Sequence, residues 1–513
     1  MRTTTELYAR NALQAPNRVA IACQYERRSY RQFWDRIRRI GSAIERSGVP
    51  RQGRVAIFAP NSIEYFEAAA AAEIGARIPT LLNFRIAAPE LKHLLEQTTP
   101  EILIFDSTLT DVVSEGCDQS SIRRFVCIGD TRPGWSIPFE TFLSEGSPEG
   151  PTEQPEPEDI GTLFFTGGTT GSPKAVPWTH EALLIAAHAM VNCEDTVLLQ
   201  NSPAFHTGGR CPVLTTMWTG GTTLLERNFD ATRWLHLVQD ERVNWTFMVP
   251  MMIQEVLDHP DFHDYDLGSL EWVMAASTAI PPQLLARAVE QMGPIFYVAY
   301  GSTEGGFVSR LRRSETRVDG SDLALRRLAS VGQVLPWADV VLVDDDRPVA
   351  PGEIGEICVR NYAFSEYWND PAATAEATWN DDYVRTGDLG IFDDEGYLFI
   401  VDRKKDMIIS GGENIYSREV EDALHRHADV QAASVIGYPD EKWDESVCAL
   451  VVPRPGCIID PVELIAFSRT QLAGYKCPKR VEVVDALPVT TAGKVDKVAI
   501  RKSLEECLSG GRS

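Results

Sequence analysis

The sequence predicts an α/β protein with a large N-terminal domain of several subdomains, built on parallel-type sheets and a β-rich subdomain, and a small mobile α+β domain at the C-terminus. Short apolar segments alternate with helical patterns through the first 150 residues, as parallel sheets require. A stretch rich in Pro and Glu at 146–159 indicates a loop or linker. The charged segment 402–406 precedes a compact run of short helices and strands. We therefore assign residues 1–401 to the N-terminal domain and 402–513 to the C-terminal domain.

The first elements follow from hydrophobic periodicity and capping residues. Apolar side chains recur at helical spacing at Phe33, Ile37, Ile40 and Ile44. A buried strand is expected over 54–60, and Asn61 and Ser62 then provide caps for an alanine-rich helix that ends near Gly75. Another strand is expected over 101–106.

The remaining elements divide into a β-rich unit and a final α+β unit. Segments 340–346 and 352–360 have the composition of strands in a smaller β-rich subdomain. Beyond the break near 402–406, the expected elements are helices at 417–427 and 461–472 and strands at 431–436, 447–453 and 480–484. No internal repeat is present.

Charge and cysteine usage exclude several classes of protein. The 513 residues contain 49 basic and 73 acidic side chains, a formal charge of −24, which argues against nucleic-acid binding. The ten cysteines form no CxxC pair, which is typical of free thiols in a reducing compartment. The N-terminus lacks the apolar core of a signal peptide, and no integral membrane segment of 18 apolar residues is present. We expect a cytoplasmic protein whose membrane contacts, if any, are peripheral.

The most specific local pattern is the run Thr166, Gly167, Gly168, Thr169, Thr170, Gly171, Ser172, Pro173 and Lys174. Its glycines let the backbone approach a ligand closely, successive N–H groups can form an anion nest, and Lys174 adds a positive charge. Together these features suit a polyphosphate. Ala175 after the lysine excludes a Walker A loop, which requires Ser or Thr there. A flexible surface loop of the same composition is the alternative.

This run closely resembles the phosphate-binding signature of the adenylate-forming superfamily, which includes acyl- and aryl-CoA synthetases, firefly luciferase and the adenylation domains of peptide synthetases. Other segments resemble further motifs of the family in the expected order. They are SPAFH at 202–206, YGSTE at 300–304, TGD at 386–388, DRKKD at 402–406, GGENIY at 411–416, and Pro488, Thr490, Gly493 and Lys494 near the C-terminus. The resemblance spans nearly the whole chain and is closest to fatty-acid or aryl-acid CoA ligases.

The resemblance implies a catalytic set drawn from distant parts of the chain. Glu304 would hold Mg²⁺, which prefers oxygen ligands, and Thr303 belongs to the same element. Lys494 would reach into the site and stabilise charge during adenylation. His206 would lie at the acyl pocket, in the path of the carboxylate. A solvated carboxylate, a surface lysine and a structural histidine are the ordinary alternatives for these residues.

For ATP, the resemblance implies a nucleotide site in the same region. Tyr300 offers a face on which adenine could stack, beside Gly301. Asp388 could accept both ribose hydroxyls, because a carboxylate has several acceptor positions. Arg403 would contact the ribose and phosphate. Taken singly, these residues could instead be a core tyrosine, a turn aspartate and a surface arginine.

A two-step reaction follows from the same resemblance. ATP and a carboxylate give an acyl-adenylate and pyrophosphate, and the thiol of coenzyme A then displaces AMP. Between the steps the C-terminal domain would rotate about a hinge at Asp402, so that the loop with Gly411 and Gly412 replaces Lys494. Trp443 could stack on a nucleotide ring of coenzyme A, and Lys476 could meet its phosphates. The alternative for Trp443 and Lys476 is an ordinary solvated surface with basic side chains and no ligand.

The acyl pocket is implied to be lined by segments around 205–210, 248–253, 275–278 and 296–306, which contain few charges. We therefore expect an apolar or aromatic carboxylic acid as substrate. An acyl-AMP ligase that loads a separate carrier protein is the alternative, and a nucleotide-binding regulator without catalysis is a more distant one. A homodimer is compatible with the sequence.

Three residues depart from the pattern that is usual in the family. Gly168 stands where serine is most frequent, Ser417 where proline is common, and Asp444 where glycine is usual after Trp443. None of the three removes a residue with a clear chemical role.

Overall fold

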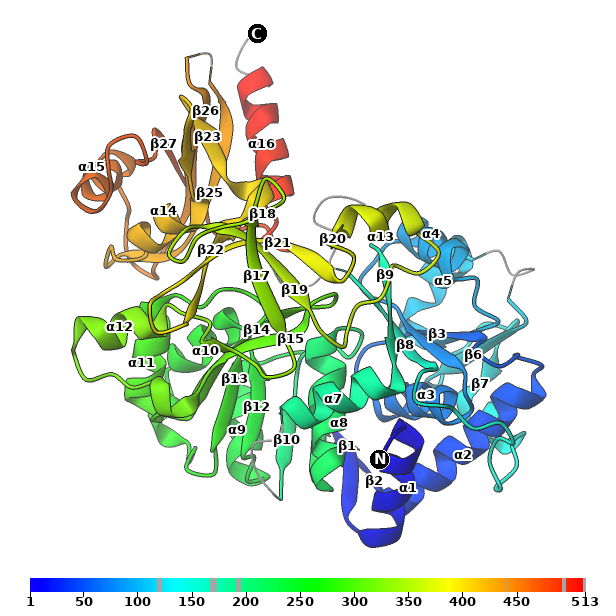
Figure 1. Ribbon diagram of the computed structural model, residues 1–513. Helices are drawn as coiled ribbons and strands as arrows, with labels where there is room; N and C mark the ends of the chain where they lie inside the picture. Colours follow the sequence, from blue (N-terminus) through cyan, green and yellow to red (C-terminus); the bar gives the residue numbers. More distant parts are fainter. Residues whose placement is uncertain (118–121, 167–172, 191–194, 441, 491–494, 511–513) are drawn as a thin grey trace.

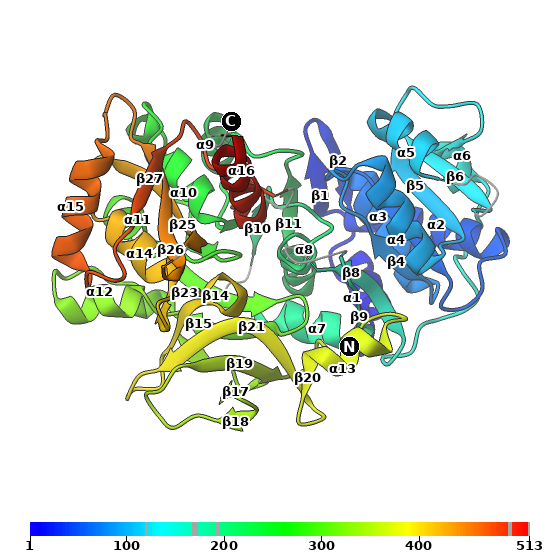
Figure 2. The ribbon, with the colours of Figure 1, turned by 90° about the horizontal axis from the view of Figure 1, so that it is seen from above.

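Four β-sheets organise the described part of the chain (Figure 1). The computed structural model describes residues 1–117, 122–166, 173–190, 195–440, 442–490 and 495–510. Two large sheets with their helices form the N-terminal body, and a third, smaller sheet precedes the C-terminal domain. The first and fourth sheets lie on opposite sides of the molecule in both views (Figures 1 and 2). The predicted fold class is confirmed.

The first sheet has the strand order β7-β6-β5-β3-β4-β8-β9 and is parallel except for the β8–β9 hairpin. Its strands are β3 (Arg54–Phe58), β4 (Ile78–Leu81), β5 (Ile102–Asp106), β6 (Arg124–Ile128), β7 (Ile137–Pro138), β8 (Ile160–Phe165) and β9 (Ala175–Thr179). The helices of this region are α1 (Thr4–Gln14), α2 (Tyr30–Arg46), α3 (Ile63–Ile74), α4 (Ala88–Thr98), η1 (Ser107–Leu109), α5 (Thr110–Gly116) and α6 (Phe139–Ser144). Helix α3 begins and ends as predicted, because the Ser62 hydroxyl accepts from the Tyr65 amide and Gly75 follows its last turn.

The second sheet has the order β16-β15-β14-β13-β12-β10-β11-β1-β2 and is parallel from β14 to β1. Its strands are β1 (Val19–Cys23), β2 (Glu26–Ser29), β10 (Val197–Gln200), β11 (Thr222–Leu225), β12 (Trp245–Met248), β13 (Trp272–Ala275), β14 (Phe296–Ser302), β15 (Gly306–Leu311) and β16 (Gln333–Val334). Its helices are α7 (His180–Ala189), α8 (Thr207–Thr219), α9 (Ala231–Asp240), α10 (Pro250–Leu257), η2 (Phe262–Asp264), α11 (Pro282–Met292), η3 (Arg313–Glu315) and α12 (Asp322–Leu328). The carboxyl ends of parallel strands share one edge, so the segments after β10, β12 and β13 lie beside Tyr300 at the end of β14.

The third sheet is antiparallel and contains the predicted β-rich unit. Its strands are β17 (Asp339–Asp344), β18 (Arg347–Pro348), β19 (Gly355–Arg360), β20 (Thr378–Trp379), β21 (Tyr383–Phe392) and β22 (Leu398–Arg403), with helices α13 (Pro371–Ala377) and η4 (Lys404–Asp406). Strand β22 pairs with β21 as far as the Asp388–Arg403 pair. The chain therefore crosses position 402 while still inside a strand.

The fourth sheet belongs to the C-terminal segment and has the order β24-β23-β26-β25, with β27 parallel to β26. Its strands are β23 (Ile408–Ser410), β24 (Glu413–Ile415), β25 (Val430–Asp440), β26 (Asp444–Pro453) and β27 (Arg480–Val483), with helices α14 (Ser417–Leu424), α15 (Pro461–Gln471) and α16 (Lys497–Gly510). Strands β25 and β26 extend beyond their predicted limits because their ends pair as a hairpin from Tyr438 to Asp444. Helix α14 ends at Leu424, three residues before the predicted end at 427.

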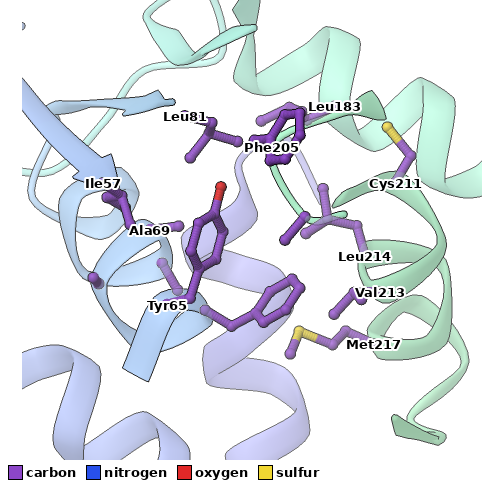
Figure 3. Close-up of a cluster of buried hydrophobic side chains, with 14 of the residues drawn as sticks. Ile57, Tyr65, Ala69, Leu81, Leu183, Phe205, Cys211, Val213, Leu214 and Met217 are labelled. Carbon is purple, nitrogen blue, oxygen red and sulfur yellow. The ribbon is translucent and has the colours of Figure 1, made fainter. Parts of the chain in front are cut away.

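A buried apolar cluster joins the two large sheets (Figure 3). Side chains from β3, α3 and β4 meet side chains from α7 and α8, including Ile57, Tyr65, Ala69, Leu81, Leu183, Leu214 and Met217. Phe205, immediately before α8, belongs to the same cluster and is 3% exposed. Burial on this scale fixes the start of α8, and with it the position of His206, relative to the first sheet.

Candidate active site

Tyr300, Asp388 and Arg403 form a connected cluster between the second and third sheets. The Tyr300 hydroxyl donates to Oδ2 of Asp388 at 2.8 Å, and Nε of Arg403 lies 2.6 Å from Oδ1. Asp388 and Arg403 are register partners on β21 and β22, and Asp388 is only 6% exposed. The three residues predicted for the nucleotide are thus brought together, and both oxygens of the carboxylate are engaged.

The electrostatics of this cluster favour a neutral tyrosine and a charged arginine. Burial, and then the charge of Asp388, raise the pKa of Tyr300 well above its ordinary value. Asp388 also raises the pKa of Arg403, against the opposing effect of burial. Tyr300 therefore stays a hydrogen-bond donor, and Arg403 keeps its positive charge for an anionic ligand.

A cavity of about 670 Å³ opens next to this cluster. Both basic and acidic side chains line its wall. The lining residues include Lys174, Glu304, Glu356, Tyr367, Glu376, Arg385, Thr386, Gly387, Arg403, Lys404 and Lys405. The volume and the cations suit a phosphate chain, and the carboxylates provide oxygen ligands for a cation that accompanies it.

The predicted phosphate loop closes the β8–β9 hairpin. The Thr166 amide donates to the Lys174 carbonyl at 2.9 Å, and the Lys174 amide donates to the Thr166 hydroxyl at 3.0 Å. These bonds hold the two ends of the loop together at the rim of the cavity. Six further residues of this run lie outside the described residues: Gly167, Gly168, Thr169, Thr170, Gly171 and Ser172.

Thr303 and Glu304 follow the end of β14. The Thr303 carbonyl accepts from the Trp178 indole N–H at 2.9 Å, which fixes the backbone at this point. The Glu304 side chain lines the cavity, and its Oε1 accepts from the Tyr367 hydroxyl at 2.9 Å. Gly301 is required by its surroundings, because a Cβ there would lie 2.0 Å from the Gly306 carbonyl oxygen.

His206 occupies the N-cap position of α8, with its ring 4.3 Å from the Phe205 ring. Two residues on, Gly208 lies against the face of Phe247, so that a Cβ on Gly208 would be 3.1 Å from Cζ of that ring. Arg210, at the end of the predicted pocket segment, faces the core instead. It is 1% exposed and forms an ion pair with Glu73.

Asp402, the predicted hinge, is 6% exposed and is tied to two helices of the C-terminal domain. Its carboxylate accepts from the backbone amide of Ser417 and from the Ser417 hydroxyl at 3.0 Å. That hydroxyl in turn accepts from Nζ of Lys497 at 2.7 Å, and Nζ lies 2.8 Å from Glu421. Burial raises the pKa of Asp402, although Lys497 opposes the shift.

The residues predicted for coenzyme A lie in the turns and loops that connect elements of the C-terminal unit, and none of them is among the residues that line the cavity. Gly411 and Gly412 form the turn between β23 and β24, and both have positive φ, 61° and 85°. The Nζ atoms of Lys442 and Lys479 lie 4.6 and 4.7 Å from the centroid of the Trp443 ring. Nζ of Lys476 lies 2.8 Å from both Glu419 oxygens, so its charge is already partnered.

Lys494 lies outside the described residues, so its predicted role stays a prediction. Sequence reasoning missed Tyr367, Ser417 as a hydrogen-bonding group, and Lys497. Tyr367 stands in an ordinary polar stretch, FSEYWNDP, with no spacing that marks it. Lys497 follows Lys494 by three residues, and only the fold shows that it faces Asp402.

Comparison with known proteins decides the family. The model of the AMP-binding enzyme family matches residues 8–368, and that of the AMP-binding enzyme C-terminal domain matches residues 419–494. The chain belongs to the AMP-binding enzyme family. The resemblance inferred from the motifs is therefore confirmed, and the protein is an adenylate-forming acid–thiol ligase of the acyl-CoA synthetase type.

Similar proteins cover nearly the whole of this AMP-binding enzyme. It is 34% identical to a feruloyl-CoA synthase of Amycolatopsis sp. over 500 residues, which cover 96% of this chain and 97% of the relative. It is also 34% identical to an indoleacetate–CoA ligase of Aromatoleum aromaticum, with 97% of each chain covered. The solved structure of the amide bond synthetase McbA from Marinactinospora thermotolerans superimposes with a TM-score of 0.87 at 30% identity, covering 98% of this chain and 99% of that one. Within the described ranges, no helix of this enzyme is both long and apolar enough to span a bilayer.

Proposed function

We propose that this ligase activates an aromatic carboxylic acid with Mg²⁺–ATP and transfers the acyl group to coenzyme A. The observation that carries the ATP half is the position of the Tyr300–Asp388–Arg403 cluster beside a 670 Å³ cavity lined by Lys174 and Glu304. The aromatic substrate is supported by the apolar segments beside that cluster and by the names of the two relatives.

In the first step the protein must bring together two anions, the carboxylate of the acid and the triphosphate of ATP. Lys174 and Arg403 provide positive charge where the triphosphate would lie, and the low exposure of Asp388 strengthens the interactions around it. Asp388 would accept the ribose hydroxyls, with Tyr300 and Arg403 holding its two oxygens in place. Lys494 would add charge near the reacting phosphate, as the motif implies.

Glu304 fits the role of the Mg²⁺ ligand. It lines the cavity, its Oε1 is held by Tyr367, and its Oε2 accepts no hydrogen bond from the described part of the chain. No cluster of three potential ligands was found among the described residues, so phosphate and water oxygens would complete the coordination. When bound at Glu304, Mg²⁺ would supply positive charge that neutralises the phosphate chain.

The acid would lie beside the aromatic side chains at the start of α8. Gly208 allows the backbone to approach the buried Phe247 ring closely, and any side chain at 208 would press on that ring. Phe205 packs edge-to-face on Phe84 nearby, at 5.8 Å between centroids. Such surfaces suit an aromatic ring, and His206 stands where the carboxylate would enter.

In the second step coenzyme A would approach the C-terminal loop with Gly411 and Gly412, after rotation at Asp402. Trp443 and the two lysines on its ring offer a platform for a nucleotide with phosphates. In this proposal the two domains that rotate relative to each other are residues 1–401 and residues 402–513.

The test is a panel of cinnamic, arylacetic, benzoic and fatty acids with ATP, Mg²⁺ and coenzyme A. Pyrophosphate and AMP are followed, and the thioester is identified by mass. We expect thioester with an aromatic acid and only weak turnover with fatty acids. Pyrophosphate release without thioester would shift the acceptor to a carrier protein or an amine. Turnover of fatty acids alone would contradict the aromatic assignment.

A further inference from the structure

Tyr367 connects two residues of the proposed adenylation site, Glu304 and Lys174. It lies in the segment between β19 and α13 and is 6% exposed. Its hydroxyl donates to Oε1 of Glu304 at 2.9 Å, and its ring face lies under the ammonium of Lys174, 4.7 Å from Nζ to the ring centroid. All three residues line the same cavity.

The hydrogen bond determines how Glu304 presents its carboxylate. The tyrosine hydroxyl is the donor in this bond, because a carboxylate only accepts. One oxygen of Glu304 is therefore held, so the carboxylate that lines the cavity has little rotational freedom. A ligand oxygen that is already oriented loses less entropy when a cation binds.

The ring of Tyr367 makes the second contact, with the Lys174 ammonium. An ammonium over an aromatic face is attracted to it by roughly 0.5–1 kcal/mol, and by more when it is partly desolvated. This contact keeps Lys174, at the end of the phosphate loop, pointing at the cavity rather than into solvent. Tyr367 thus sets the distance between the Lys174 ammonium and the Glu304 carboxylate, which would both act on the same phosphate chain.

We propose that Tyr367 is a positioning residue of the adenylation step, which orients Glu304 through its hydroxyl and Lys174 through its ring. The inference depends on the proposed function, because Glu304 and Lys174 matter only if Mg²⁺–ATP occupies the cavity. Tyr367 touches neither reacting group in this arrangement and acts through its two neighbours.

Two substitutions separate the two contacts. Tyr367→Phe removes the hydroxyl and keeps the ring, whereas Tyr367→Leu removes both. Tyr362→Phe is the matched control: it lies five residues away, and its hydroxyl accepts from the Phe307 backbone amide at 3.2 Å. It removes a buried hydroxyl without touching Glu304 or Lys174.

Three measurements are made on each full-length variant: pyrophosphate exchange against Mg²⁺ concentration, calorimetric binding of Mg²⁺–α,β-methylene-ATP, and thioester formation from supplied acyl-AMP. We expect Tyr367→Phe to need about 10-fold more Mg²⁺ for half-maximal exchange and to bind the analogue more weakly at low Mg²⁺. Tyr367→Leu should weaken analogue binding by a further 2- to 5-fold at saturating Mg²⁺, an effect on the order of the cation–π contact. Thioester formation from acyl-AMP should be unchanged in both.

Each other result overturns the inference. Wild-type Mg²⁺ dependence in Tyr367→Phe would show that the hydroxyl does not orient Glu304. Equal loss of both half-reactions, or the same behaviour in Tyr362→Phe, would show a purely structural role. The proposed function fails separately, if the wild-type enzyme shows no pyrophosphate exchange with any aromatic acid while it still binds the analogue.

Discussion

Gly411 lies directly against the indole ring of Trp443. Its amide donates to the Trp443 carbonyl at 2.8 Å, and a Cβ at position 411 would lie 2.7 Å from Cε3 of the ring. With φ at +61°, the position also disfavours any L side chain. The sequence marks Gly411 only as part of a loop motif. The structure shows that its lack of a side chain lets the Trp443 ring lie close to the backbone, on the surface predicted to bind coenzyme A.

Gly411→Ala should impair thioester formation more than adenylation. The added methyl must displace Trp443, which the proposed second step needs, while the cavity around Glu304 is untouched. Supplied acyl-AMP should be converted at least 10-fold more slowly, with pyrophosphate exchange within a factor of about two, a shift of roughly 1.4 kcal/mol or more in the second step alone. Gly412→Ala is the comparison, since it imposes similar backbone strain with no atom within 4 Å of the new Cβ. Equal effects of the two variants would contradict the role of the tryptophan contact.

Asp444→Gly should stabilise the protein. Asp444 has φ at +65°, in the left-handed region, at the position where the family usually has glycine. This conformation costs an L residue roughly 1 kcal/mol, and somewhat less for aspartate. We expect a free energy of unfolding up to about 1 kcal/mol higher, measured by urea denaturation. An unchanged or lower value would show that the side chain contributes an interaction that offsets the strain.

Asp388→Asn should weaken ATP binding. In the native cluster both carboxylate oxygens accept hydrogen bonds, from Tyr300 and from Arg403. An amide supplies one oxygen and one NH₂, so one of the two donors would face another donor. We expect KM for ATP to rise about 10- to 100-fold, as for the loss of a hydrogen bond to a charged group. If KM for the acid rose while KM for ATP stayed constant, Asp388 would not be part of the nucleotide site.

Lys494→Ala should slow adenylation strongly and spare the second half-reaction. The motif places this lysine in the first step only, and the loss of a preorganised charge of this kind costs about 10²–10³ in rate. Pyrophosphate exchange should fall by that factor, whereas supplied acyl-AMP should still give thioester. A parallel loss in both assays would contradict the proposed exchange of C-terminal loops.

Features that depend only on residues close together in the sequence could be predicted from the sequence. The limits of α3 follow from Ser62 and Gly75, and the nucleotide residues lie in motifs with fixed internal spacing. Tyr367 could not be predicted, because its function depends on contacts with Glu304 and Lys174, 63 and 193 positions away. Arg210 was placed in a pocket segment by position alone, and its burial against Glu73 is a property of α8 packing on α3.

The departure at Ser417 became explicable only from the fold. Proline at that position would lack the amide that donates to Asp402, and the serine hydroxyl adds a link from Asp402 to Lys497. The sequence shows a substitution in a loop motif; the structure shows a hydrogen-bonded connection between the predicted hinge and the first residue of α16.

Lys497→Met should destabilise the C-terminal domain in a pH-dependent way. The ammonium lies between Glu421 and the Ser417–Asp402 pair, and its side chain is 17% exposed. Removing it leaves two partly buried carboxylates without their cation, which costs about 1–3 kcal/mol of unfolding free energy.

The sign of the pH dependence follows from Asp402. Burial already raises its pKa in the folded state, and loss of Lys497 raises it further. A raised carboxyl pKa means that the folded state binds the proton more tightly, so stability is lost as pH rises through the folded pKa. The deficit of Lys497→Met against wild type should therefore be larger at pH 8 than at pH 5, measured by thermal unfolding. Arg454→Met, which removes a bond to the Ala428 carbonyl, should show a deficit that does not vary with pH. A pH-independent deficit in Lys497→Met would mean that the lysine does not act on the Asp402 carboxylate, whereas recovery in Lys497→Arg would confirm that the positive charge is what Asp402 requires.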